Sequence, residues 1–373
     1  MKKLIVAILV SIFVVNQAWS QVYSDKVAGK KNQAHADSLK KAEYPYLLPI
    51  WGQKVTQKGF TLPYSAGLSL NYFGQESDLI IDNLSVGFNN GPQYDLNEII
   101  RFNSAVSTAQ SISLRPDFWI FPFLNVYGIF AKAKTSTAID AGLWLPDTAN
   151  NWNEIAAFSS KADFDAVTAG FGMTPTVGVA GCFLALDMNM AWTSISAIEK
   201  PVFSFVFGPR LGKSFKFKNP NRNISIWAGG FRVSMSSETN GSLNLAEVLP
   251  VDELQGKVDE GIAKVDEAEN NVNAWWVGLT EQEQNNPVNQ AKYETANNVI
   301  DATGNIMTAL DGALSTASTS TVQYSLTKKP KDMWNFVVGS QFQLNRHFMC
   351  RAEYGFLSSR QQLTLGLQYR FGF

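Results

Sequence analysis

Apolar side chains alternate with small or polar ones through most of the chain beyond residue 64. The terminal stretch "LTLGLQYRFGF" is the clearest case, with one face apolar or aromatic and the other built from Thr, Gly, Gln and Arg. Because successive side chains of a strand point to opposite faces, a period of two residues predicts β-strands. About eleven segments fit this pattern: roughly 64–73, 79–89, 106–117, 123–133, 166–178, 183–195, 201–214, 224–236, 334–344, 347–357 and 361–373.

The apolar face of the last strand continues to the end of the sequence and becomes aromatic there, with Tyr369, Phe371 and Phe373 on one side. Aromatic side chains are enriched where a membrane protein meets the membrane–water interface. A soluble β-sandwich buries its apolar face and shows a similar alternation. The aromatic end favours the other arrangement, in which the apolar face meets lipid.

The N-terminal residues have the pattern of a secretory signal peptide over residues 1–20. Lys2 and Lys3 precede an apolar run over residues 4–15, and Ala18-Trp19-Ser20 offers a small-x-small cleavage site. No later segment approaches the roughly twenty consecutive apolar residues that a membrane helix needs. A closed barrel is the other way to satisfy backbone groups in lipid, so we expect an exported transmembrane β-barrel.

Composition and charge alter this picture little. Of the 373 residues, 45% are hydrophobic, 17% are charged and 12% are aromatic, as expected for a barrel with an apolar exterior and polar interior. The formal net charge of −1 provides no general attraction to nucleic acid.

The terminal strand resembles that of Gram-negative outer-membrane β-barrel proteins. The resemblance is carried by alternating residues, namely Leu365, Leu367, Tyr369, Phe371 and the final Phe373. In that family this pattern is the signal that the outer-membrane assembly machinery reads. The resemblance therefore implies a location in the outer membrane, with its lipids and that machinery as partners. The resemblance does not imply any activity. The stretches "DFWIFPFLNVYG" and "SFVFGPRLGKSF" also resemble parts of uncharacterised members of the class, and they imply no activity either.

The predicted fold is all-β, an antiparallel up-and-down barrel. Bacterial barrels have an even number of strands, so we expect about twelve, give or take two, and a missed strand between Phe88 and Val106 or before Tyr64. The predicted divisions are the signal peptide 1–20, a periplasmic segment or plug 21–63, barrel strands 64–236, a helical insertion 237–333 and barrel strands 334–373. If the last strand runs toward the periplasm, the long interruptions near 134–165 and 237–333 lie outside the cell.

The insertion changes from strand to helix periodicity. Apolar residues recur at helical spacing from Val251 to Trp276, among many carboxylates, and a second series runs from Val288 to Leu314. Between them, Thr280 with Glu283 forms a potential capping box. This pattern predicts a helical hairpin in an extracellular loop. Its helices pack only on each other, or they form a lid over the pore or a handle for an extracellular partner through residues 251–318.

Charged residues on the polar face of the strands are the candidate lumen residues, and five of the eight are Arg. They either pair with one another to neutralise buried charge or form a basic constriction that favours anions. The candidates are Arg115, Asp117, Asp187, Arg210, Arg232, Arg351, Glu353 and Arg370.

Catalytic chemistry is not indicated by the sequence. A lipid hydrolase would need a His near a Ser, but His35 precedes the barrel and His347 falls in a predicted inner turn. No G-x-S-x-G, P-loop or Cys/His metal spacing occurs, so we expect no enzyme activity, metal or cofactor. Cys182 and Cys350 fall on lipid-facing positions of non-neighbouring strands, which predicts two free thiols.

Three classes of function remain open from the sequence. The first is a narrow channel for small hydrophilic solutes, and the second is a structural or surface-interaction barrel that presents the helical hairpin. A lipid-acting outer-membrane enzyme is the third.

Overall fold

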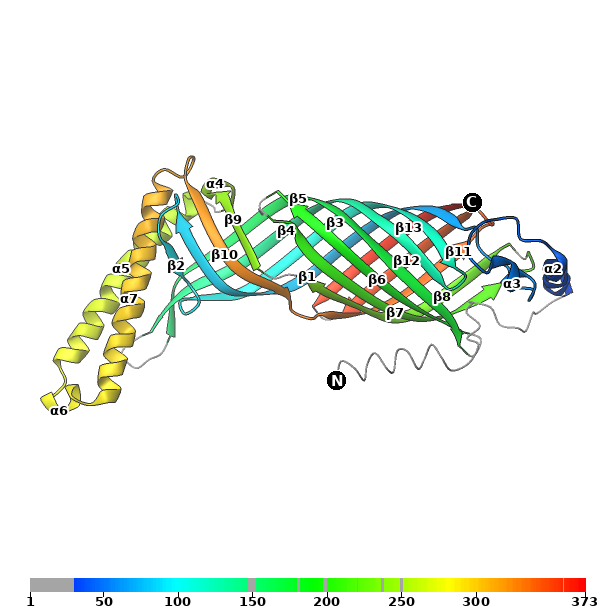
Figure 1. The fold of residues 1–373 in the computed structure, drawn as a ribbon. Coiled ribbons are helices and arrows are strands. Elements are labelled where there is room, and N and C mark those ends of the chain that lie inside the picture. The colour runs from blue at the N-terminus through cyan, green and yellow to red at the C-terminus, as the bar shows by residue number, and fades with distance from the viewer. Residues whose placement is uncertain are drawn as a thin grey trace.

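The computed structural model describes residues 30–146, 152–179, 182–196, 200–219, 221–235, 238–248, 251–357 and 359–373. The predicted signal peptide lies outside these residues. Within them, the chain forms an elongated barrel with a helical hairpin at one end, called here the hairpin end (Figure 1). The opposite end, which carries the C-terminus and the first described helices, is called the terminal end.

Ten strands of the described chain close into the predicted up-and-down barrel. Each pairs antiparallel with its neighbours in the ring, and the last strand pairs with the first from Ala66↔Phe371 to Ser77↔Arg360. In ring order they are β1 (Ala66–Phe88), β3 (Ile100–Phe121), β4 (Leu124–Pro146), β5 (Trp152–Val179), β6 (Cys182–Ile195), β7 (Val202–Lys216), β8 (Asn223–Met235), β11 (Trp334–Gln343), β12 (Phe348–Leu357) and β13 (Arg360–Phe371).

The odd strand count from the sequence arose from splitting one strand. A short strand does lie between Phe88 and Val106, over Gln93–Asp95, but it pairs with β1 outside the barrel ring. Segments 64–73 and 79–89 belong to the single strand β1, whose register shifts between Asp82 and Ser85. The predicted loop near 134–165 is also largely strand, because β4 continues to Pro146 and β5 begins at Trp152. Small and charged residues there hid the strand signal. The cysteines Cys182 and Cys350 are free, as predicted.

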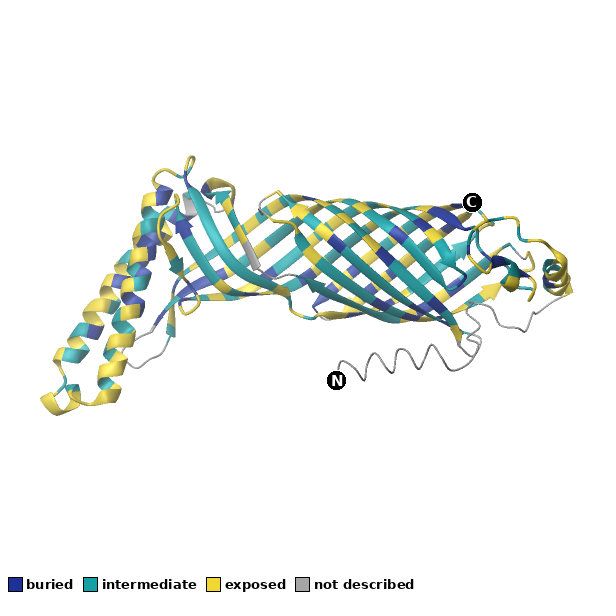
Figure 2. Cartoon of the chain, in the orientation of Figure 1, coloured by how far each residue is buried: buried dark blue, intermediate teal, exposed yellow. Residues whose placement is uncertain are grey.

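An apolar band surrounds the half of the barrel nearer the terminal end. On β13 and the two residues after it, the band runs from Leu363 to Phe373, and Leu367 is 65% exposed. The ten steps between these residues, at ~3.3 Å each on a strand tilted by ~40°, cover about 25 Å along the barrel axis, which is the height of a lipid-facing band. Aromatic contacts mark both edges, with Phe118–Phe373 at one and Trp192–Phe203 at the other. Figure 2 shows the resulting alternation of exposed and less exposed residues along the strands.

The polarity of the strands reverses beyond this band. On β4, outward Phe130 is followed by outward Lys132 and Lys134, which are exposed. The inward positions change in the opposite sense, from Tyr127 to Leu143. An outer surface that turns polar while the inner surface turns apolar is expected where a barrel leaves lipid and enters water. The same reversal explains why the sequence left the 123–133 strand ambiguous, since Lys132 shares a face with Phe130.

Additional strands and the predicted helical hairpin extend the hairpin end. Beyond Asp78, β1 leaves β13 and pairs with β10 (Thr321–Pro330) and β2 (Gln93–Asp95), and β10 pairs with β9 (Glu238–Asn244). The helices are α4 (Leu245–Val248), α5 (Val251–Val277), α6 (Glu281–Gln284) and α7 (Pro287–Leu314). Thr280 and Glu283 form the expected capping box between them. None of the described helices is long and apolar enough to cross a bilayer.

The hairpin packs on the barrel as well as on itself. Val258 and Met307, from its two helices, are almost fully buried in one core with Leu143 of β4 and Ile155 of β5. Toward α6 the exposed residues predominate, and this part of the hairpin projects away from the barrel (Figures 1 and 2). The distal helices are held together by Trp276 stacked on Tyr293 at 4.5 Å.

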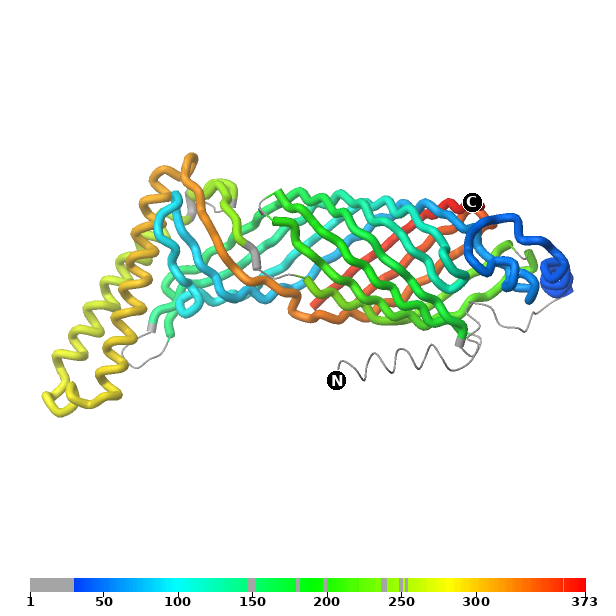
Figure 3. Tube along the Cα trace, in the orientation of Figure 1, coloured from blue at the N-terminus to red at the C-terminus, as the bar shows by residue number. Residues whose placement is uncertain are grey.

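The described part of the predicted N-terminal segment, residues 30–63, caps the terminal end and does not plug the lumen. It contains α2 (Lys30–Lys41) and α3 (Gly52–Thr56), which lie beyond the ends of the strands (Figure 3). The Leu47 amide donates to the Phe373 carbonyl at 3.1 Å, and the Ile50 amide donates to the Ile120 carbonyl at 2.9 Å. Pro63 is the residue of this segment that lines the lumen cavity described below.

Candidate functional site in the barrel lumen

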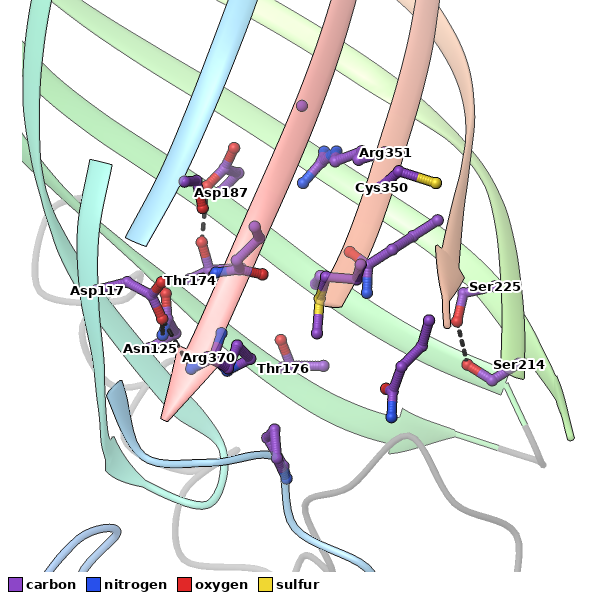
Figure 4. Close-up of a pocket in the computed structure, with 18 of the residues that line it drawn as sticks. Asp117, Asn125, Thr174, Thr176, Asp187, Ser214, Ser225, Cys350, Arg351 and Arg370 are labelled. Carbon is purple, nitrogen blue, oxygen red and sulfur yellow. Dashed lines mark hydrogen bonds and ion pairs between the residues drawn. The ribbon is translucent and has the colours of Figure 1, made fainter. Parts of the chain in front are cut away.

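The lumen contains two cavities with different linings. The polar cavity, of about 290 Å³, lies toward the terminal end (Figure 4). The apolar chamber, of about 440 Å³, lies under the helical hairpin. No described residue lines both cavities. Six of the eight candidate lumen charges line the polar cavity: Arg115, Asp117, Asp187, Arg210, Arg351 and Arg370.

Arg210 on β7 is the centre of one ion-pair network. Its Nε donates to Glu353 Oε2 at 2.6 Å and its Nη2 donates to Glu353 Oε1 at 2.8 Å, while Nη1 reaches Asp187 Oδ2 at 3.1 Å. In the barrel ring, β8 and β11 separate β7 from Glu353 on β12, so this pair crosses part of the lumen. Trp227 donates its indole N–H to Glu353 at 2.7 Å, and Tyr127 donates its hydroxyl to Asp187. Buried carboxylates and guanidinium thus have their hydrogen-bonding capacity largely filled.

A second network joins Asp117 on β3 to Arg370 on β13. Arg370 Nη2 donates to Asp117 Oδ1 at 2.8 Å, and its Nε donates to the Tyr64 carbonyl at 3.0 Å. Asn125 and Gln368 donate to the same carboxylate at 2.8 and 2.6 Å. This network links β3 to the last strand, β13, on either side of β1, and to the chain that enters β1, so it has a structural role at the closing seam.

Two of the predicted lumen arginines retain freedom to face a solute. Arg351 Nη2 lies 3.1 Å from Glu353, but its side chain is 34% exposed, against 7% for Arg210. Arg115 lies over the Tyr127 ring at 4.0 Å from the ring centroid and lines the polar cavity. The electrostatic field in this cavity therefore depends most on Arg115 and Arg351.

The placement of Arg232 in the lumen was wrong. Its cross-strand partners are Phe207 and Trp334, which face outward, whereas Trp227 faces inward five residues earlier on the same strand. Its Nη2 lies 3.9 Å from the sulfur of Met333 at the hairpin-side edge of the band. An Arg among aromatic residues at this edge can extend its guanidinium toward the interface.

Sequence reasoning missed the uncharged partners and several basic residues, among them Lys216 in the lining of the polar cavity. Tyr127 and Trp227 are large aromatics, which the pattern assigns most readily to the lipid face, although both complete the Arg210 network. Arg360 is 1% exposed and donates to the Asp332 carbonyl at 2.9 Å. Lys328 faces the apolar chamber from β10. Strand parity could have found Tyr127 and Trp227, but nothing local marks Lys328.

The five residues of the predicted assembly signal all lie on the outer surface of β13 or just beyond it. Each is at least 41% exposed: Leu365, Leu367, Tyr369, Phe371 and Phe373. Ser65 holds the end of the chain by accepting the Phe373 amide at 2.9 Å. Recognition of these residues by assembly machinery stays a prediction.

A closed antiparallel barrel with an apolar outer band between aromatic edges, and with ion pairs inside, defines an outer-membrane β-barrel protein. This chain belongs to that class. No protein-family model matches it, and no curated protein is significantly similar in sequence.

Among solved structures, the chain is similar to several outer-membrane barrels. The translocator domain of the autotransporter NalP from Neisseria meningitidis matches with TM-score 0.32 and 7% identity, over 92% of this chain and 94% of that one. The transport unit of the autotransporter AIDA-I from Escherichia coli matches with TM-score 0.30 and 9% identity, over 91% and 99%. An outer membrane channel from Pseudomonas putida F1 matches with TM-score 0.27 and 9% identity, over 83% and 97%. Likeness at this level assigns no function.

Proposed function

We propose that the protein is a narrow channel for small hydrophilic solutes, with a preference for anions. The observation that carries the proposal is the charge of the polar cavity. Five cationic side chains line it: Arg115, Arg210, Lys216, Arg351 and Arg370. Asp117, Asp187 and Glu353, the partner of Arg210, offset three of these charges, so the cavity keeps a net positive charge. Fixed charge of one sign in a low-dielectric pore concentrates mobile ions of the opposite sign.

The pairing of Arg210 with Glu353 across the lumen argues for a small conductance. Buried side chains that cross the lumen narrow the path available to water and ions. We therefore expect passage of small solutes rather than the wide aqueous flow of a large porin.

A bilayer recording under a KCl gradient tests this function. Purified wild-type barrel should give small, anion-selective currents, and Arg351→Glu should move the reversal potential toward cation selectivity. Arg232→Glu is the matched control, because the same charge change on the outer face should leave selectivity unchanged. A wild-type barrel without current, or with clear cation selectivity, would refute the proposal.

A second candidate is a surface-interaction barrel that presents the hairpin, which we assign to the extracellular side with the terminal end in the periplasm. It is favoured by the exposed distal part of the hairpin, which projects beyond the barrel strands (Figure 2). Replacing residues 262–303 by a short Gly/Ser linker should keep the hairpin base on the barrel. Capture of an extracellular partner should then be lost while channel currents persist.

We also propose that the protein is not an enzyme. His347 Nδ1 lies 2.8 Å from the Arg370 carbonyl oxygen, and His35 Nε2 lies 3.3 Å from Thr61 Oγ1. Burial, together with Lys216 and Arg346, lowers the pKa of His35. Both contacts support structural roles for the imidazoles. A lipid hydrolysis assay on the refolded barrel should show no turnover.

A further inference from the structure

The apolar chamber at the hairpin end is a second feature of the lumen, separate from the polar cavity. Its walls come from β1, β3, β4 and β5, through side chains such as Ile81, Phe102, Ile139 and Phe164. Its volume of about 440 Å³ falls in the range of small-molecule sites. Apolar cavities exclude water and accept apolar molecules of matching size. The chamber is therefore suited to a hydrophobic ligand.

The chamber lies where the strands have left the apolar band. Outward Lys161 and Asp163 on β5 are exposed to water, while Phe164 and Ala162 beside them face the chamber. Lipid of the bilayer does not explain an apolar surface there, because the apolar surface is on the inside.

The base of the helical hairpin covers the chamber. Leu254 and Val258 from the first turns of α5, and Met307 and Leu310 from the last turns of α7, contribute to its lining. The same turns belong to the core that joins the hairpin to the strands. The hairpin base is thus part of the ligand site, rather than a separate unit.

Three lysines line the chamber, and Lys328 is the one that strand register turns inward. Its register partner is Ile81, so it points inward, whereas the next residue, Lys329, points outward and pairs with Asp82 at 2.9 Å. Burial lowers the pKa of the Lys328 ammonium. Across the part of the chain that the structure describes, no side chain or carbonyl hydrogen-bonds to it or forms an ion pair with it. A desolvated ammonium without a partner is costly, and an anionic ligand group would offset that cost.

We propose that the chamber binds a long-chain carboxylate, with its hydrocarbon chain among the apolar walls and its carboxylate on Lys328. Lys257 lines the same chamber from α5 and donates to the Ala157 carbonyl at 3.2 Å, so it adds positive charge nearby. This site is independent of the proposed channel, since binding and conductance are separate measurements.

The test is binding of radiolabelled dodecanoate to the full-length barrel in lipid nanodiscs, with empty nanodiscs subtracted. The wild type should bind saturably, with one ligand per barrel. Lys328→Met should weaken binding about 10- to 100-fold, as expected for loss of a charged hydrogen bond. Lys328→Arg should retain binding, and Lys161→Met, which removes an exposed outward charge of β5 outside the chamber lining, should leave it unchanged.

Two results would overturn the assignment. One is no saturable binding above empty nanodiscs. The other is equal dodecanoate affinity in Lys328→Met and wild type, which would make the chamber a site for neutral hydrocarbons. Dodecanol, which lacks the carboxylate, should bind both proteins alike. It also shows that the chamber of Lys328→Met is intact.

Discussion

Arg210 and Glu353 form a bidentate ion pair across the lumen, with N–O distances of 2.6 and 2.8 Å. Both side chains are nearly inaccessible to solvent, at 7% and 3% exposed. Such a pair stabilises a barrel only while both partners remain, because either charge alone would be buried without compensation.

Arg210→Met should therefore lower the free energy of unfolding by about 3–5 kcal/mol. Urea unfolding in lipid vesicles, followed by tryptophan fluorescence, measures this change. The double variant Arg210→Met/Glu353→Met should recover part of the loss. Lys161→Met, which removes an exposed outward charge, serves as the control. Equal stability of Arg210→Met and wild type would mean that the pair contributes little.

Removing both partners should also widen the path through the barrel. Arg210→Ala/Glu353→Ala deletes the side chains that cross the lumen, so single-channel conductance should increase over the wild type. Arg370→Ala/Asp117→Ala removes a pair at the strand seam instead, and it should affect stability more than conductance. Unchanged conductance in the first variant would place the constriction elsewhere.

The lipid-facing band can be tested with a charge placed on either face of the barrel. Leu367→Arg should lower the free energy of folding into vesicles by about 2–4 kcal/mol, as for a charge in the apolar part of a bilayer. Gln341→Arg, on the lumen face, should lower the free energy of folding by less. Gly339, another lumen position, is unsuitable for this control because an added Cβ would lie 2.5 Å from the Trp227 ring. Similar losses in both variants would argue against the band.

The terminal aromatic offers a separate prediction about assembly. Phe373→Ser keeps the backbone contacts to Ser65 and Leu47 but removes the ring that lies beside Phe118 at 6.4 Å. Assembly in cells should fall more than refolding in detergent, because the ring serves recognition as well as packing. If both assays fall equally, packing alone accounts for the effect.

The junction between hairpin and barrel should be sensitive to a buried charge. Val258 is 2% exposed in the core that joins α5 to the strands. Val258→Asp should release the base of the hairpin from the barrel, and limited proteolysis should then cleave within α5. The barrel itself should stay folded, as measured by the shift in gel mobility between unheated and heated samples. Asp259→Asn, at the adjacent exposed position, should change neither readout.

Local sequence determined the strands, the class of barrel and the helical hairpin. Alternation depends only on neighbouring residues, and an apolar face that ends in aromatics reports its contact with lipid directly. The capping box at Thr280 and Glu283 is equally local, and it was found at the predicted place. The split of β1 into two segments shows the limit, because the polar residues 74–78 interrupt the apolar alternation although the strand continues through them.

Tertiary structure alone decided which charges meet and which cavity each side chain faces. Arg210 and Glu353 are 143 residues apart, and their contact depends on barrel closure and strand register. Arg232 and Lys328 show the same dependence in opposite directions. The sequence placed Arg232 inside, although pairing with Phe207 turns it outward. Lys328 has an outward neighbour of the same charge, and only its register with Ile81 directs it into the apolar chamber.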